Sequence, residues 1–404
     1  MVPEVISEGS GSLGGMPSKR SEVPPFEVMT VLDQVATLRA QGADVISLCA
    51  GEPAGGAPSP VSAAAAEFHS SAQPFGYTPA LGIWPLREAL AGHYRRWYGI
   101  EVSPAEVAIT TGSSGAFLLA FLAAFDAGDR VALARPGYPA YRNILSSLGC
   151  EVVDVDCGPE VRFQPTVAQL DAEHAVRPLA GVILASPANP TGTMVTRDEL
   201  AALVSWCEGH DVLLISDEIY HGVTYGDSRG ASAREFGRAS VVVSSWSKYW
   251  GMTGWRLGWM LAPAELIAAV DALAGNLALC PPAPAQVAAL ASFSDESYAE
   301  CDAAVAGFAR ARELLLDARG RLGWGVAAPA DGAFYYYADL GPQLERFGSS
   351  SAYAAALLRD TGVALTPGTD FDSRLGHRTV RISFAAGEQA IAEAIERIVA
   401  FHTR

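Results

Sequence analysis

Short apolar runs of strand length alternate with helix-like stretches through the middle of the chain, and this alternation restricts the fold more than any other feature. Helical stretches such as Arg197–Cys207 and Pro263–Ala272 separate most of these runs. Apolar strands joined through helices are typical of a parallel sheet with both faces covered. The pattern therefore predicts an α/β fold with a mostly parallel seven-stranded sheet covered by helices. The strand-like runs are Glu106–Thr110, Arg130–Ala134, Glu151–Val155, Gly181–Ala185, Val212–Ile215, Ser240–Ser244 and Leu257–Leu261.

The whole chain divides into four predicted parts. Residues 1–24 are rich in Gly, Ser and Pro and are expected to form a mobile leader. Residues 25–60 begin with an amphipathic helix at Phe26–Gly42 and are expected to join a small domain. Residues 61–292 would form the large domain. Residues 293–404, which begin with a long Ala-rich helix, would form a second, smaller α+β domain.

The composition restricts the partners of the protein. A formal net charge of −16 over 404 residues would repel nucleic acids and anionic lipids. The longest apolar run, Gly115–Phe125, is shorter than the ~20 residues of a membrane span. Six scattered cysteines without a C-x-x-C pair indicate a reduced, cytoplasmic protein with no metal site. A G-x-G-x-x-G match at Gly9–Gly14 lacks the flanking strand and helix of a dinucleotide site.

Lysine is nearly absent from the chain, and this makes Lys248 conspicuous. Of 28 Lys and Arg residues only Lys19, in the leader, and Lys248 are lysines. An arginine would supply the same positive charge but not an amine that can lose its proton. A lysine beside Arg256 and several aromatic residues is expected to have a lowered pKa, which favours nucleophilic chemistry. A lysine on an exposed loop is the alternative.

Two of the turns that follow predicted strands have the composition of a phosphate site. Gly112, Ser113 and Ser114 lie between a strand and an apolar helix, where free N–H groups and the helix dipole attract anions. An ordinary helix cap is the alternative for this turn. Ser245 and Arg256, around Lys248, would add a hydroxyl and a guanidinium to the same phosphate.

Two further turns carry an amide, a carboxylate and a phenol. Prolines on both sides restrict the backbone of Asn189, so its amide can be aimed, although an ordinary turn also fits. Asp217 ends an apolar strand, where a carboxylate needs a partner; a helix cap is the alternative. Tyr220 would face the same ligand if the turn is helical. Taken together, these groups describe a pocket for pyridoxal phosphate.

With these motifs in this order, the sequence resembles those of the fold-type I pyridoxal-phosphate enzymes, in particular the class I/II aminotransferases of the aspartate aminotransferase superfamily. The similarity covers about residues 25–402. The NPTG element and the S-x-S-K-x-x-x-x-x-G-x-R-x-G element are its most specific marks. The other marks are AGEP (Ala50–Pro53), GYTPALGIWPLREAL (Gly76–Leu90), TTGSSGA, ARPGYPAY (Ala134–Tyr141), SDEIY, DGAFYYY (Asp331–Tyr337) and VRISFA (Val380–Ala385).

The resemblance implies a role for each matching residue in moving an amino group from an L-amino acid to a 2-oxo acid. Lys248 resembles the lysine that condenses with the cofactor aldehyde and later moves a proton at the substrate. Asp217 resembles the acid that pairs with the ring nitrogen, and Asn189 and Tyr220 resemble the donors to the 3′-oxygen. The catalytic residues would then be Lys248, Asp217 and Tyr220. The phosphate would be held by Gly112, Ser113, Ser114, Ser245 and Arg256.

The resemblance also implies contacts to the substrate and to a second subunit. Tyr138 matches the aromatic residue that stacks on the ring, although a core aromatic is the alternative. Tyr77 matches a tyrosine that reaches the phosphate of the neighbouring subunit, which implies a homodimer with shared active sites. Arg381 resembles the arginine that binds the substrate α-carboxylate, with Gly51 donating its N–H and Asn189 close by.

Three departures from the family pattern bear on the substrate. The sequence after GEP is AGGAP, where the family often has an acid and an aromatic residue. Asp372 stands in PGTDFD where the family pattern has a glycine. Residues 113–127 contain no Lys or Arg, whereas family members that act on dicarboxylates often have a basic residue near this loop. These features favour a neutral or aromatic amino donor.

Other functions remain open at this point. A β-lyase or a decarboxylase would use the same cofactor and scaffold, and a non-catalytic pyridoxal-phosphate sensor would add a DNA-binding domain. Ser245 and Lys248 also match S-x-x-K, the serine β-lactamase signature, but no K-T-G accompanies it.

Overall fold

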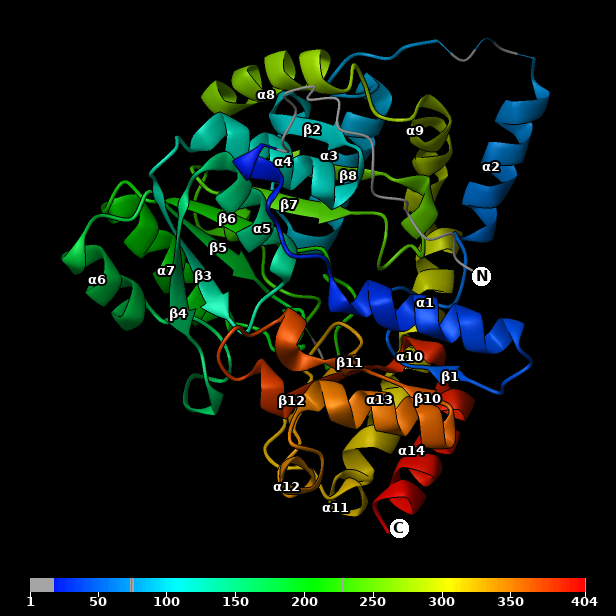
Figure 1. Cartoon of the computed structure of the whole chain (residues 1–404). Helices are drawn as coiled ribbons and strands as arrows, with labels where there is room; N and C mark the ends of the chain where they lie inside the picture. Colours follow the sequence, from blue (N-terminus) through cyan, green and yellow to red (C-terminus); the bar gives the residue numbers. More distant parts are fainter. Residues whose placement is uncertain (1–17, 73, 75, 227, 404) are drawn as a thin grey trace, which may run out of the picture.

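The computed structural model describes residues 18–72, 74, 76–226 and 228–403. Its centre is a seven-stranded sheet in the order β2-β8-β7-β6-β5-β3-β4 (Figure 1). Each of the seven strand-like runs forms one of these strands, so the predicted α/β fold is confirmed. The strands are β2 (Val107–Thr110), β3 (Arg130–Arg135), β4 (Glu151–Asp156), β5 (Gly181–Ala185), β6 (Leu213–Asp217), β7 (Val241–Ser245) and β8 (Gly258–Leu261).

One strand of the central sheet runs against its neighbours. The β4-β3, β3-β5, β5-β6 and β6-β7 pairs are parallel, whereas β8 is antiparallel to both β7 and β2. The connection from β7 to β8 contains only a short 3-10 turn at Thr253–Trp255 and no helix that could return the chain for a parallel pairing. This connection contains Lys248, so the reversal of β8 and the lysine loop are one feature of the fold.

Alternate residues of the strands pack into two cores on opposite faces of the sheet. In β5, Val182 and Leu184 pack with α3, α6 and α7, whereas Ile183 packs with α4, α5 and α8. Strand side chains alternate between faces, so apolar runs of this kind bury both faces. The helices are α3 (Trp84–Tyr98), α4 (Gly112–Ala124), α5 (Pro139–Leu148), α6 (Val167–Val176), α7 (Arg197–Gly209) and α8 (Ala264–Leu277).

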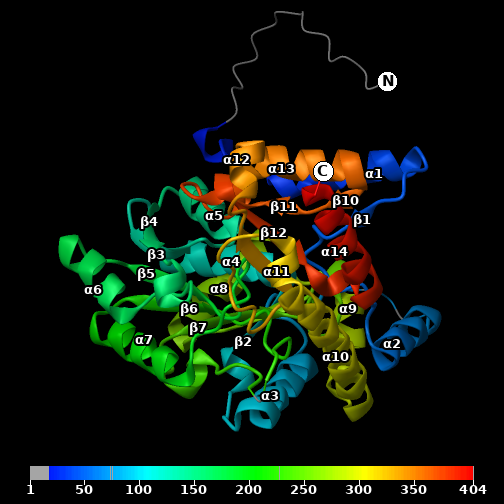
Figure 2. The same ribbon diagram turned by 90° about the horizontal axis from the view of Figure 1, so that it is seen from below.

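The remaining elements include a smaller antiparallel sheet in the order β11-β12-β9. A separate parallel pair joins β1 near the N-terminus to β10 near the C-terminus. Figure 2 shows α1 beside α13, and the two helices line one groove. The strands are β1 (Ile46–Ser47), β9 (Tyr335–Asp339), β10 (Val363–Ala364), β11 (Thr366–Pro367) and β12 (Thr379–Ser383). The helices are α1 (Glu27–Ala40), α2 (Ser59–Ser70), α9 (Ala283–Ala289), α10 (Asp295–Asp317), α11 (Arg319–Leu322), α12 (Gln343–Phe347), α13 (Ser350–Thr361) and α14 (Glu388–His402).

Several expectations about partners and organisation are not settled by the fold. No helix in the described part of the chain has the length and apolar character needed to cross a membrane. Within the same residues, no group of three or more His, Cys, Asp or Glu side chains could hold a metal ion. The domain boundaries at residues 60 and 292 and the cytoplasmic location stay predictions. The Gly9–Gly14 motif lies outside the described residues.

Candidate active site

A cavity of about 520 Å³ lies where the parallel strands of the central sheet end. Ser113 and Ser114 reach it from the turn after β2, Asn189 from the turn after β5, and Lys248 from the loop after β7. Tyr335 of β9 and Arg381 of β12 line it from the smaller sheet. Ligands of open α/β sheets bind at this edge, so the cavity is the candidate active site.

Lys248 is half-buried on the cavity wall. Its Nζ donates a hydrogen bond to the Gly51 carbonyl and lies 5.7 Å from the centre of the Tyr220 ring. Burial lowers the pKa of Lys248 to about 8; the nearby Glu52 carboxylate opposes this shift and Arg381 adds to it. The sequence predicted a lowered pKa from the neighbouring arginine and aromatic residues, and the largest cause is burial.

Two tryptophans fix the loop that carries this lysine. The Trp246 indole N–H donates to the Ser292 hydroxyl at 2.8 Å, and the Trp250 indole N–H donates to the Ser292 carbonyl at 2.9 Å. All three residues are buried. Because both indoles bind one residue, the backbone on each side of Lys248 is held against the turn that follows α9.

Asp217, the last residue of β6, presents a buried carboxylate to the cavity. Burial raises the pKa of Asp217 to about 6, while hydrogen bonds from the Tyr141 hydroxyl and the Ile219 N–H lower it. The Ile219 N–H lies 3.0 Å from the carboxylate. The charged form is stabilised by these donors and by Lys248 across the cavity. The cavity thus holds an amine and a carboxylate that both titrate near neutral pH.

The start of α4 and Arg256 form a tight cradle beside the cavity. Gly112 has a φ of 67°, and a side chain added there would place its Cβ 2.5 Å from the Arg256 guanidinium. A Cβ on Gly258 would meet the Ser113 backbone nitrogen at 2.6 Å. Arg256 itself has a positive φ of 54°, a conformation that persists in non-glycine residues where the surroundings impose it. The cradle therefore brings the start of α4, with Ser113 and Ser114, together with the Arg256 guanidinium beside the cavity.

Arg381 closes the opposite side of the cavity. Its guanidinium lies between the Tyr335 and Phe371 rings, 4.4 and 4.7 Å from their centres. It donates to the Asn189 side-chain oxygen at 2.9 Å and to the Cys49 carbonyl at 2.7 Å. The Arg381 Nε is buried and has no hydrogen-bond partner among the described residues. This guanidinium can therefore still bind a carboxylate.

The structure gathers most of the predicted site residues on the wall of one cavity. These are Gly51, Ser113, Ser114, Tyr138, Asn189, Asp217, Tyr220, Lys248, Arg256 and Arg381. Gly112 lies behind them against Arg256. The buried Ser245 hydroxyl accepts from the Ser247 N–H at 2.9 Å, and Ser247 rather than Ser245 lines the cavity. Tyr77 is 85% exposed and lies outside the cavity.

Four other residues that line or support the site were not among the predicted ones. Tyr141 binds Asp217, and the Tyr335 hydroxyl lies 2.7 Å from the Tyr220 hydroxyl. Asp370 and Phe371 line the cavity from the loop after β11. Tyr141 and Tyr335 occur inside the quoted motifs ARPGYPAY and DGAFYYY, so the motifs contained this signal. Their contacts depend on residues far away in the sequence.

The site fits pyridoxal phosphate by the chemistry of its groups. The Lys248 amine, whose pKa is lowered, suits an aldehyde, and the buried Asp217 carboxylate suits a protonated ring nitrogen. The cradle at the start of α4, which a Cβ on Gly112 would fill, suits a phosphate.

Comparison with known proteins gives one consistent family. Residues 43–398 match the family described as aminotransferase class I and II. The valine–pyruvate aminotransferase of Mycobacterium tuberculosis is 54% identical over 380 residues, which are 94% of this chain and 96% of that protein. The aspartate/prephenate aminotransferase of Thermus thermophilus is 33% identical over 386 residues, 95% of this chain and 97% of that protein.

Solved structures agree with these sequence matches. The crystal structure of an aminotransferase from Mycobacterium tuberculosis has a TM-score of 0.92 at 52% identity, covering 96% of this chain and 99% of that one. The aspartate aminotransferase from Thermus thermophilus with maleate has a TM-score of 0.89 at 33% identity, with the same coverage of both chains.

The buried carboxylate of Asp217 leads to a prediction about stability. Its pKa is higher in the folded protein than the ordinary 3.8, so the charged form destabilises the folded state at neutral pH. In the cofactor-free protein, Asp217→Asn should raise the free energy of unfolding at neutral pH by on the order of 2–3 kcal/mol. The gain should vanish below about pH 4, where both the folded and the unfolded protein carry a neutral Asp217. Urea denaturation of both proteins, at neutral pH and below about pH 4, measures this difference in the free energy of unfolding.

Asp317→Asn is a matched control because Asp317 lies exposed at the end of α10. It should change the free energy of unfolding by less than about 0.5 kcal/mol. If Asp217→Asn is less stable than the unaltered protein at neutral pH, the electrostatic account of this carboxylate is wrong.

Proposed function

Because the chain belongs to the class I and II aminotransferase family, we propose that it transfers the amino group of valine, or of a similar uncharged branched amino acid, to pyruvate. The chain is a pyridoxal-phosphate-dependent aminotransferase, and the proposal concerns its substrate pair. The name of the Mycobacterium tuberculosis relative supports this pair. The relatives lend no support to a β-lyase, a decarboxylase or a sensor.

The charges in the cavity carry the proposal. Among the described residues that line it, the basic side chains are those of Lys248, Arg256 and Arg381. Lys248 would bind the cofactor aldehyde, Arg256 the phosphate, and Arg381 the substrate α-carboxylate. No fourth cation among the described residues lines the cavity to pair with a second carboxylate. An acidic amino donor would therefore bring a charge into this cavity without a partner from the same chain.

The cavity also has an apolar wall. Phe26, Val28, Met29 and Leu32, from the start of α1 and the residue before it, line the cavity. The Asp370 carboxylate holds this end of α1 by accepting hydrogen bonds from the Glu27 and Val28 N–H groups at 2.7 and 2.9 Å. An aliphatic side chain of the donor would bury its surface against this wall.

Pyridoxal phosphate supplies an aldehyde that condenses with amines and a ring that draws electrons from the bonds of the attached α-carbon. Each residue then has one task. The Lys248 amine moves a proton at the substrate α-carbon, because burial leaves it partly uncharged near neutral pH. Arg381 orients the substrate through its carboxylate. The residues that would hold the cofactor are Gly112, Ser113, Ser114, Tyr138, Asn189, Asp217, Tyr220, Lys248 and Arg256.

A donor-by-acceptor screen tests the substrate pair. With pyruvate as the acceptor, valine should give alanine and 3-methyl-2-oxobutanoate. The kcat/KM for valine should exceed that for aspartate by roughly 100-fold, because aspartate places a second carboxylate in the apolar part of the cavity. Amino-acid and oxo-acid products are quantified by mass spectrometry. Aspartate as the better donor, or pyruvate and ammonia formed without an acceptor, would refute the proposal.

Lys248→Arg tests the proposed role of the amine. The variant keeps the positive charge but loses a group that can be deprotonated, so we expect it to fall to the activity of Lys248→Ala. Borohydride reduction should leave a pyridoxyl adduct on Lys248 of the unaltered protein and none on either variant. The rate at which the cofactor-free protein condenses with added pyridoxal phosphate should increase as the pH rises through about 8, where the amine loses its proton. Lys19→Arg is the control, and full activity of Lys248→Arg would refute the role.

The surface near Tyr77 supports a homodimer with shared active sites. Tyr77 is 85% exposed, and Leu277 and Leu279 at the end of α8 are each more than half exposed. A hydrogen bond from the Thr78 N–H to the Cys280 sulfur at 3.4 Å brings the two segments together. Large exposed apolar side chains that cluster are typical of interfaces. The resemblance to the family implies that a second subunit covering them would bring its Tyr77 to the phosphate of this site.

We expect the double variant Leu277→Glu/Leu279→Glu to be a monomer, because dimerisation would bury two carboxylates without partners. Sedimentation velocity measures the mass of the protein in solution. The amount of cofactor retained after dialysis measures how fully the site is occupied. Val176→Glu, at a side chain that is 79% exposed on α6, is the control and should stay a dimer. Tyr77→Phe should stay a dimer and lose cofactor faster. A fully occupied, active monomer would disprove the shared site.

A further inference from the structure

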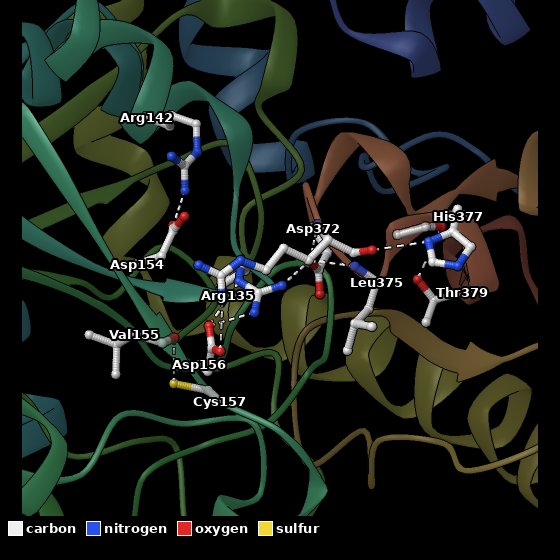
Figure 3. A network of polar contacts seen from close by, with 12 residues as sticks. Arg135, Arg142, Asp154, Val155, Asp156, Cys157, Asp372, Leu375, His377 and Thr379 are labelled. Carbon is white, nitrogen blue, oxygen red and sulfur yellow. Dashed lines mark hydrogen bonds and ion pairs between the residues drawn. The ribbon is translucent and has the colours of Figure 1, made fainter.

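Outside the cavity, one buried ion pair joins the central sheet to the loop that follows β11. Arg135, the last residue of β3, and Asp372 lie 237 positions apart in the sequence, and their side chains are 6% and 4% exposed. Figure 3 shows the Arg135 guanidinium between two carboxylates: it donates to Asp372 and, with its Nε at 3.0 Å, to Asp156 at the end of β4. Asp156 is itself largely exposed.

The Asp372 carboxylate also closes a turn in its own loop. The same oxygen that binds Arg135 accepts the backbone N–H groups of Arg374 and Leu375, at 2.8 and 2.9 Å. A buried carboxylate is tolerated only where donors of this kind satisfy it. Asp372 therefore depends on Arg135, and the turn of its loop depends on Asp372.

The two residues before Asp372 reach into the active site. The Phe371 carbonyl accepts the Gly137 N–H at 3.0 Å, beside Tyr138, and the Phe371 ring covers the Arg381 guanidinium. Asp370 holds the start of α1, as described above. Three consecutive residues therefore contact the apolar wall, the carboxylate-binding arginine and the central sheet.

We propose that Arg135 and Asp372 are positioning residues: their buried ion pair fixes the loop that carries Asp370 and Phe371 and so sets where Arg381 meets the substrate carboxylate. The proposal rests on the proposed function for its substrate. The family pattern has a glycine at the position of Asp372, so this chain places a charge where that pattern has none. The φ of Asp372 lies outside the left-handed region, so a residue with a side chain is accommodated at this position without strain.

Removing one charge leaves the other buried without a partner, which favours a shifted loop. A shift of this kind changes how a carboxylate is bound without touching the groups that hold the cofactor. A pair with a purely structural role would instead lower stability and leave substrate binding intact in the folded protein. Measuring the affinity for a carboxylate at constant cofactor content therefore distinguishes a positioning role from a purely structural one.

The experiment uses Asp372→Asn in the cofactor-loaded, full-length protein. Asparagine keeps an oxygen for the two backbone N–H groups and loses the charge that pairs with Arg135. Binding of 3-methylbutanoate, a carboxylate with a branched side chain and no amine, is measured by calorimetry. We expect its affinity to fall by roughly 10- to 100-fold, with KM for valine rising in parallel and kcat and cofactor content changing little. Arg374→Ala is the matched control, because this exposed side chain binds only Asp156 among the described residues and should leave the affinity unchanged.

Equal affinity in Asp372→Asn, Arg374→Ala and the unaltered protein would overturn the proposal. If Asp372→Asn does not fold, the double variant Arg135→Met/Asp372→Leu removes both charges and restores a packed, neutral pair. Weak carboxylate binding by this folded variant supports the proposal, and unaltered binding overturns it. Because 3-methylbutanoate binding needs no turnover, failure of the unaltered protein to use valine would refute the proposed substrate and leave this test valid.

Discussion

The burial of charged groups at one edge of the central sheet is the constraint on which the rest of the structure depends. Asp217 and Arg381 are buried and Lys248 is half-buried around one cavity. Each is tolerated because donors or acceptors are held in place for it: the Gly51 carbonyl for Lys248, Tyr141 for Asp217, and the Cys49 carbonyl for Arg381. The same burial moves the pKa values of Lys248 and Asp217 towards neutrality, where proton transfer is useful.

The fold supplies those partners by joining distant parts of the chain. The parallel strands present the amide, the carboxylate and the amine from successive turns, and the short β7-β8 connection holds the amine between two anchored tryptophans. The smaller sheet brings Arg381 with the aromatic rings that enclose it. Neither sheet has a complete site alone. The contacts between the sheets, among them the Arg135–Asp372 pair, therefore matter to the chemistry as well as to the fold.

Much of this arrangement follows from local patterns. The seven apolar runs become the seven strands because a strand buried on both faces needs apolar residues throughout, which a single sequence displays. The scarcity of lysine pointed to Lys248, and the turns after strands pointed to Asn189 and Asp217. The antiparallel direction of β8 did not follow from composition. It depends on the lack of a crossover helix between β7 and β8.

The sequence alone determined the α/β class, the family and the identity of most groups on the cavity wall, because periodicity and short motifs are local properties. Only the tertiary structure decided which side chains surround these groups. The deciding contacts join residues that are far apart in the chain: Tyr141 with Asp217, Tyr335 with Tyr220, and Asp372 with Arg135. Burial, hydrogen-bond geometry and the pKa shifts they cause arise from such contacts, and no local stretch of sequence contains them.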